Sequence, residues 1–143
     1  MDCTSLFIAA VEAGRNLSVT DPDIINKTLL MVADAAVANS EFIVGENARD
    51  LALMEESDPR FDRLLLTAER IENIAADIRN VVDLPNPLER VLMKSTRPNG
   101  LIVSKVSVPF GVIGVIYEAR PNVTFDVFSL CLKSGNTCIL KGG

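Results

Sequence analysis

The sequence predicts an α/β fold in which antiparallel helices are followed by one parallel β-α-β unit. Apolar residues recur with helical spacing between residues 21 and 82. After about residue 95 the pattern changes to β-branched runs separated by turn residues. The last part of the chain has the order strand, turn, helix, strand, which is the order of a parallel crossover.

The composition excludes several classes of protein. The net charge is −5 and the pI is near 4.7, with one tyrosine and no tryptophan, which argues against nucleic acid as a partner. No apolar run approaches the ~20 residues of a membrane-spanning helix, so no membrane is expected. The mean hydropathy of +0.27 is high, which predicts apolar surface that is buried against more chain or another subunit.

The reactive side chains are few. There is no histidine, which removes histidine acid/base chemistry and histidine metal ligands. Cys3, Cys131 and Cys138 are too widely spaced for a disulfide framework or a zinc knuckle, so we expect reduced thiols, no metal site and a cytoplasmic protein. The start of the chain has no basic segment of the kind found in secretory signals.

Three antiparallel helices are expected between residues 21 and 82. Thr20 or Asp21 can cap the first helix, and Pro22 suits its first turn. The second helix carries Asn47 on an otherwise apolar face, which is the weak point of its pattern. A pair of closely spaced prolines ends the third helix.

Two strands are expected next. The turn-rich run from Lys94 to Gly100 introduces residues 101–108, whose alternation predicts a strand half open to solvent. Residues 112–117 are continuously apolar and β-branched, which is typical of a strand covered on both faces.

A helix over residues 123–134, stopped by Gly135, and a last strand over residues 137–141 complete the β-α-β unit. Because the strands are parallel, their carboxyl ends meet at one edge. Two cations, an asparagine, a tyrosine and free helix amides at this edge suit a phosphate-bearing ligand. The residues at this edge are Tyr117, Glu118, Ala119, Arg120, Pro121, Asn122, Lys141, Gly142 and Gly143.

Other features favour structural roles. Gly111 and Gly114 precede their strand and lack a third glycine, so they are not a dinucleotide fingerprint. Cys131 lies among leucines and Cys138 lies in a strand, so both are expected to be inert buried thiols. Lys141 follows a buried strand, a position that suits a ligand as well as solvent.

The run Gly-Val-Ile-Gly-Val-Ile-Tyr-Glu-Ala-Arg-Pro-Asn-Val-Thr, from Gly111 to Thr124, resembles the glutamate-5-semialdehyde dehydrogenases. These enzymes are also called gamma-glutamyl phosphate reductases and belong to the aldehyde dehydrogenase superfamily. Residues 132–136 and 139–143 also resemble the sequences of these enzymes, as do helical segments such as residues 46–51. The resemblance covers essentially the whole chain but only about the first third of a family member.

The resemblance implies a Rossmann-like aldehyde dehydrogenase cofactor domain, of which the chain holds a part. Residues 1–143 would be a partial NADP-binding domain, with a helical segment over residues 1–94 and strands with the crossover helix over residues 95–143. Family members reduce L-glutamate 5-phosphate with NADPH to glutamate 5-semialdehyde, a step of proline biosynthesis in the cytoplasm. They use a cysteine nucleophile that forms a thioester.

The same resemblance implies roles for individual residues. Asn122 would polarise the acyl oxygen in an oxyanion role, although a gap in the motif leaves either Arg120 or Asn122 for this position. Arg120 equally suits the substrate phosphate. Lys141 would reach the adenosine ribose or its 2′-phosphate. The cofactor-binding positions are Tyr117, Glu118, Ala119, Arg120, Lys141 and Gly142.

The family nucleophile lies downstream, in a separate catalytic domain, and neither Cys131 nor Cys138 matches its motif. We therefore expect the chain to be a fragment that is inactive alone and that forms homo-oligomers through exposed strand surface. Two other functions stay open: a non-catalytic nucleotide-binding or assembly module, and a helical adaptor. A thermal shift with NADPH separates these two.

Overall fold

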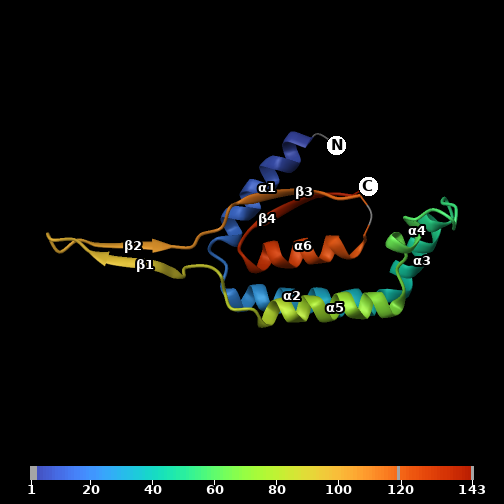
Figure 1. Cartoon of the computed structure of the whole chain (residues 1–143), viewed down its shortest axis with the longest axis horizontal. Coiled ribbons are helices and arrows are strands. Elements are labelled where there is room, and N and C mark those ends of the chain that lie inside the picture. Colours follow the sequence, from blue (N-terminus) through green and yellow to red (C-terminus); the bar gives the residue numbers. More distant parts are fainter. Residues whose placement is uncertain (1–2, 119, 143) are drawn as a thin grey trace.

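The protein is a mixed helix and strand structure, and the computed structural model describes residues 3–118 and 120–142. In chain order the elements are α1 (Cys3–Leu17), α2 (Pro22–Ala38), α3 (Ser40–Leu51), α4 (Phe61–Leu64), α5 (Ala68–Asp83), β1 (Val91–Thr96), β2 (Ile102–Val106), β3 (Val112–Ile116), α6 (Asn122–Lys133) and β4 (Thr137–Lys141). Figure 1 shows β3 and β4 between α1 and α6, with the paired helices α2 and α5 below α6. The β1–β2 hairpin extends away on one side, and α3 and α4 lie at the opposite end.

The main apolar core lies between α2 and α5. Leu29 of α2 and Ile71 and Ile78 of α5 each have at most 2% of their surface exposed. The two helices run side by side in opposite directions (Figure 1), which confirms the antiparallel prediction for this pair. The prediction is wrong for α3, which follows α2 after a short break and turns away from it by 66°. A short helix that leaves the pair in this way can cover its end but cannot pack along it.

Local signals set where the helices begin. The Asp21 carboxylate accepts a hydrogen bond from the Asp23 amide at 2.8 Å, and Pro22 is the first residue of α2. The Thr67 hydroxyl accepts from the Arg70 amide at 3.1 Å and so caps α5. The caps satisfy amides that have no partner within their own helix.

Asn47, the polar residue in an apolar stripe, is a clamp between α3 and the chain that enters α5. Its amide nitrogen donates to the Leu64 carbonyl at 2.8 Å, and its amide oxygen accepts from the Leu66 amide at 2.7 Å. Only a side chain with one donor and one acceptor can serve both backbone groups at once. The residue that weakened the sequence pattern therefore fixes the segment between α4 and α5.

The β structure begins earlier than the sequence predicted. Val91–Thr96 falls largely in the expected helical segment, yet it forms β1 and pairs antiparallel with β2, with Ser95 opposite Val103. The turn between them contains Gly100, whose φ of +83° suits glycine. Leucine, methionine and lysine in β1 favour helix locally, so its conformation depends on pairing with the later strand.

The β-α-β unit forms as predicted. β3 and β4 are parallel, with Val112 opposite Thr137 and Ile116 opposite Lys141, and α6 connects them. The prediction that β3 is covered on both faces is wrong for this chain, since Ile116 has 86% of its surface exposed. The physical reason is that α1 packs mainly against β4 and leaves part of β3 open.

Within the described residues, no single helix has both the length and the apolar character needed to cross a membrane. Taken together, α2 and α3 are long and apolar enough by length and composition alone, but the two helices are bent relative to each other.

Candidate functional site

The carboxyl ends of β3 and β4 lie at one edge of the strand pair. The Tyr117 amide donates to the Lys141 carbonyl at 3.1 Å, so the pairing continues one residue beyond β3. Figure 1 shows both strands ending on the same side of the molecule, beside the start of α6. The topology thus brings Tyr117 and Lys141 together, although they are far apart in the sequence.

Tyr117 connects this edge to α6. Its hydroxyl shares a hydrogen bond with the hydroxyl of Thr124, in the first turn of α6. Gly142 lies against the same ring, where an added Cβ would be 3.7 Å from the Tyr117 hydroxyl oxygen, an ordinary contact distance. The Lys141 side chain is exposed and donates to the Gly142 carbonyl. An exposed cation and a fixed phenol are residue types that suit the phosphate or ribose of a nucleotide.

The turn after β3 leads away from this edge. Glu118 is exposed. The pKa of Arg60 is raised, first by its hydrogen bond with Asp58, and the negative charge of Glu118 adds a small further rise. Glu118 therefore lies near the segment before α4 that contains Arg60. Ala119, one of the predicted cofactor-binding residues, lies outside the described residues. Arg120 has a φ of +143°, which a residue with a Cβ rarely adopts.

Arg120 and Asn122 line a cavity of about 400 Å³ between the turn, α4 and α5. Lys141 and Gly142 do not line this cavity. The described site residues therefore form two groups, with Tyr117, Lys141 and Gly142 at the strand ends and Arg120 and Asn122 at the cavity beside α5. Pro121, which the sequence placed at the same edge, also lines the cavity. The other residues that line it, none of them predicted from the sequence, are Asp62, Arg63, Leu65, Leu66, Arg70, Asn73, Ile74 and Asp77.

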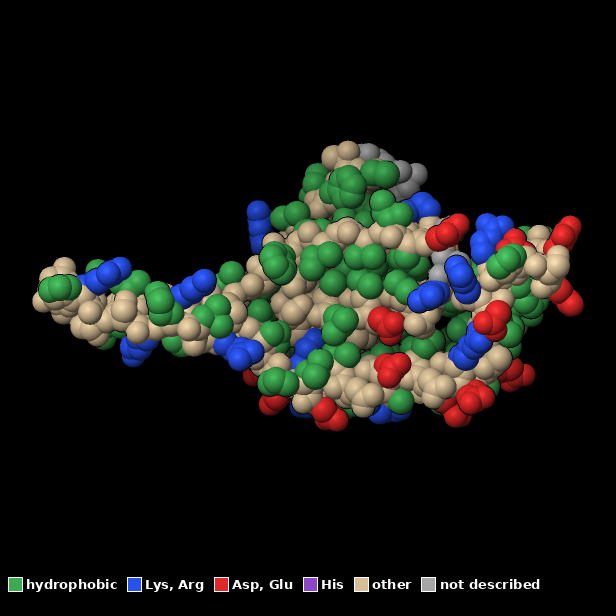
Figure 2. All heavy atoms as spheres, viewed as in Figure 1, with side chains coloured by type: hydrophobic (Ala, Val, Ile, Leu, Met, Phe, Trp, Pro, Cys, Tyr) green, Lys and Arg blue, Asp and Glu red, His purple; other side chains and the backbone are tan. Residues whose placement is uncertain are grey.

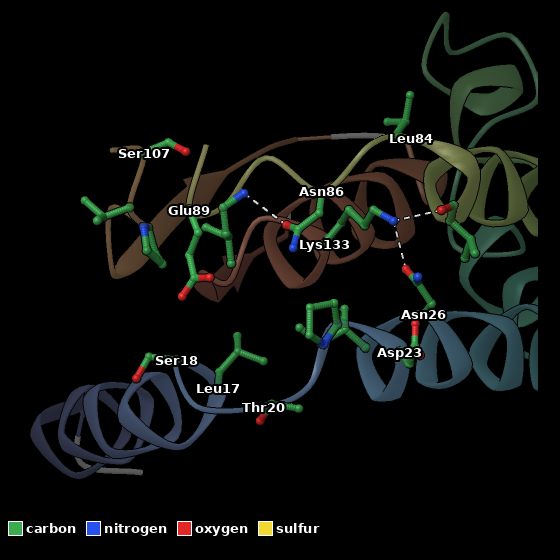
Figure 3. Close-up of a pocket in the computed structure, with 16 residues that line it drawn as sticks. Leu17, Ser18, Thr20, Asp23, Asn26, Leu84, Asn86, Glu89, Ser107 and Lys133 are labelled. Atoms are coloured by element: carbon green, nitrogen blue, oxygen red, sulfur yellow. Dashed lines mark hydrogen bonds between the residues drawn. The ribbon is translucent and has the colours of Figure 1, made fainter. Parts of the chain in front are cut away.

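A second cavity of about 500 Å³ lies at the other end of α6, near the base of the hairpin (Figure 3). Lys133 reaches into its wall from the last turn of α6 and is bonded to α2 and α5. Asn122 begins the same helix, and a helix of this length separates its ends by roughly 16 Å. This second cavity is therefore separate from the candidate site.

We expect Cys131 and Cys138 to resist thiol reagents at neutral pH. Burial raises the pKa of both thiols, and the neighbouring Cys138 adds to the rise at Cys131. A dithiobis(nitrobenzoate) time course should modify the exposed Cys3 rapidly and the other two only on unfolding. Fast modification of either in the folded chain would contradict this assignment.

The same shifts predict a pH dependence. A raised thiol pKa means that the folded chain keeps protons that the unfolded chain loses above the ordinary value of 9.0. The free energy of unfolding should therefore fall as pH rises through this range. Urea unfolding at a series of pH values measures the slope, and replacing both thiols with alanine should remove it.

Among the described residues, no three or more histidine, cysteine, aspartate or glutamate side chains form a group that could hold a metal ion.

Comparison with known proteins shows that the chain is similar to proteins of one name. The chain is 61% identical over 137 residues to the gamma-glutamyl phosphate reductase of Bacteroides thetaiotaomicron, covering 96% of this chain and 33% of that protein. It is 57% identical to the Bacteroides fragilis protein of the same name, covering 100% of this chain and 34% of that protein. No family model matches the sequence.

Solved structures agree. The crystal structure of gamma-glutamyl phosphate reductase from Thermotoga maritima matches with a TM-score of 0.89 and 34% identity, covering 94% of this chain and 33% of that one. The crystal structure of gamma-glutamyl phosphate reductase from Saccharomyces cerevisiae matches with a TM-score of 0.87 and 34% identity, covering 94% of this chain and 35% of that one. A probable aldehyde dehydrogenase from Listeria monocytogenes matches with a TM-score of 0.61, covering 98% of this chain and 29% of that one. At 16% identity this match shows a shared fold alone.

The chain spans about a third of the length of the curated relatives that it matches. Over nearly its whole length, it is similar to the N-terminal part of the gamma-glutamyl phosphate reductases.

Proposed function

We propose that this chain supplies the N-terminal part of a cytoplasmic oxidoreductase that reduces L-glutamate 5-phosphate to L-glutamate 5-semialdehyde with NADPH, in proline biosynthesis. The 61% identity to a gamma-glutamyl phosphate reductase is the observation that carries the proposal. The parallel β3-α6-β4 unit, with polar side chains at its carboxyl edge, supports a Rossmann-like cofactor domain.

The strand-end group fits the cofactor in charge and chemistry. Lys141 would hold the ribose or its phosphate, and Tyr117, kept in place by Thr124, would border the cofactor beside Gly142. NADPH would supply the hydride when bound. The family resemblance would also assign Glu118 and Ala119 to the cofactor channel.

The second group would act on the substrate. Asn122 would donate to the acyl oxygen, and Arg120 would meet the acyl phosphate with its fork of donors. The nucleophile is proposed to come from another part of the enzyme, because Cys131 is buried, Cys138 is half-buried and the pKa of both thiols is raised. We therefore propose that the chain alone does not turn over substrate.

A chimaera tests the proposal. Residues 1–143 are joined to the remaining two thirds of the Bacteroides thetaiotaomicron protein, and NADPH oxidation is followed with L-glutamate 5-phosphate. We expect substrate-dependent oxidation by the chimaera and none by this chain or by the other two thirds alone. A chimaera that folds but leaves NADPH unchanged would refute the function.

The Lys141→Met variant of the chimaera then tests the cofactor group. We expect its KM for NADPH to rise roughly tenfold, equivalent to one lost charged contact, while kcat changes little. Lys27→Met, which removes an exposed lysine on α2, is the matched control and should keep the parent KM.

We also propose that the hairpin mediates self-association. It extends from the body of the molecule (Figure 1), and side chains such as Val91, Met93 and Ile102 each have more than half of their surface exposed. Burial of these side chains against a second copy would remove apolar surface from water. Light scattering over a concentration series should show association, and a strictly monomeric chain at high concentration would contradict it.

A further inference from the structure

The cavity beside α4 and α5 contains charges of both signs, and some of them neutralise each other. Arg70 donates to the Asp62 and Leu65 carbonyls, both at 2.7 Å, and pairs with the Asp62 carboxylate at 2.8 Å. These groups brace the entry to α5. The charges of Arg70 and Asp62 are therefore already paired with each other.

The other two arginines of the cavity are free of such partners. Among the residues that the structure describes, neither Arg63 nor Arg120 makes a hydrogen bond or ion pair through its guanidinium, and both side chains line the cavity. Figure 2 shows side chains of both signs gathered at this end of the molecule, opposite the hairpin. A guanidinium with unused donors suits a carboxylate or phosphate.

Two other acidic groups, at and behind the cavity, also lack cationic partners among the described residues. Asp77 of α5 lines it, and Asp126 of α6 lies close behind, bonded to the Asn122 side chain at 3.2 Å. Burial first, and then the charge of the Asp77 carboxylate, raise the pKa of Asp126, as expected for a partly buried carboxyl group with a second carboxylate nearby. Neither carboxylate has a cationic partner within the described part of the chain. A ligand ammonium group would relieve this repulsion.

We propose that this cavity holds the amino-acid end of the substrate, with Asp77 binding its α-ammonium group and Arg63 its α-carboxylate. The identity of the ligand rests on the proposed function, and the cavity adds which residues select it. Arg120 and Asn122, which line the same cavity, are then left for the acyl phosphate end. A cavity of about 400 Å³ lies within the range of small-molecule sites.

The test uses the chain as it stands. Amide NMR spectra of the 143-residue protein are recorded during titration with L-glutamate, whose γ-carboxylate replaces the acyl phosphate. Glutarate lacks the ammonium group, and 4-aminobutyrate lacks the α-carboxylate. We expect saturable shifts at residues 62–66, 73–77 and 120–122 with L-glutamate, and about tenfold weaker binding of each analogue, equivalent to one lost charge contact.

Two variants assign the contacts. Asp77→Asn should weaken the binding of L-glutamate about tenfold and leave the binding of glutarate unchanged. Arg63→Gln should also weaken the binding of L-glutamate about tenfold, and should leave the binding of 4-aminobutyrate unchanged. Asp83→Asn, the same change at the far end of α5, should bind all three ligands as the parent chain does.

Absence of saturable shifts would overturn the inference, and so would an Asp77→Asn variant that weakens glutarate as much as L-glutamate. These outcomes differ from failure of the proposed function. A chimaera without reductase activity, in a protein that still binds L-glutamate at these amides, would remove the reaction and keep the amino-acid site.

Discussion

Replacing Gly135 with alanine should lower the free energy of unfolding by roughly 2–5 kcal/mol, the sum of a backbone cost and an overpacking cost. Gly135 has a φ of +69°, in the left-handed region where a Cβ is unfavourable. The new Cβ would lie 2.8 Å from Leu88 Cδ1 and 3.1 Å from Pro109 Cγ, so both neighbours would have to move.

The hydrogen bonds around Gly135 explain why the turn cannot simply relax. The Gly135 amide donates to the Leu132 carbonyl at 3.1 Å, and the Asn136 amide donates to the Cys131 carbonyl at 2.8 Å. These two bonds form the Schellman ending of α6. A change of φ at Gly135 would break both.

The effect should reach β3 through Asn136. The Asn136 side chain is buried and accepts a hydrogen bond from the Gly111 amide at 2.9 Å, just before β3 begins. Displacement of the turn would thus disturb the pairing of β3 with β4 and move Tyr117 relative to Lys141. We expect loss of stability and loss of order at the candidate edge together.

Urea unfolding followed by circular dichroism measures the change, and Gly45→Ala is the matched control. Gly45 lies inside α3, where an added Cβ would meet nothing within 4 Å. Helix propensity predicts that this control gains roughly 0.5–1 kcal/mol. If the two alanine variants changed stability alike, the strain at Gly135 would not exist.

The glycine stop also illustrates what the sequence alone could predict. Helix ends were predicted correctly where the signal is local, as at Asp21 and Gly135, because a cap or a left-handed residue acts within one turn. The β1 strand was missed because its residues favour helix locally and become a strand only by pairing with β2.

The candidate site divides in the same way. The turn from Tyr117 to Asn122 could be located from the sequence, because a strand, a polar turn and a helix follow one another directly. Arg63 and Asp77 could not, since a charged residue on a helix face is usually solvated and nothing in the sequence distinguishes these two. Only the fold brings Arg63 of α4, Asp77 of α5 and the turn with Arg120 to the same cavity.

Replacing Lys133 with methionine should lower the free energy of unfolding by about 2–4 kcal/mol, because it removes two hydrogen bonds from a charged donor. Lys133 has only 8% of its surface exposed. Its ammonium donates to the Asn26 side-chain oxygen at 2.8 Å and to the Val82 carbonyl at 2.7 Å (Figure 3). Among the described residues it has no carboxylate partner, so the carbonyl at the negative end of α5 and the amide of α2 carry its stabilisation.

A double-mutant cycle separates these bonds from simple packing. Methionine nearly matches the length of lysine, so Lys133→Met keeps most apolar contacts and leaves Asn26 without its donor. Adding Asn26→Leu removes that unpaired oxygen, and the double variant should lose less stability than the two single losses added together. Lys27→Met, at an exposed position of α2, should unfold as the parent chain does. If the double variant instead lost as much stability as the two single variants added together, the hydrogen bond between Lys133 and Asn26 would contribute nothing to stability. Lys133 would then stabilise the contact between α6 and α2 through packing alone.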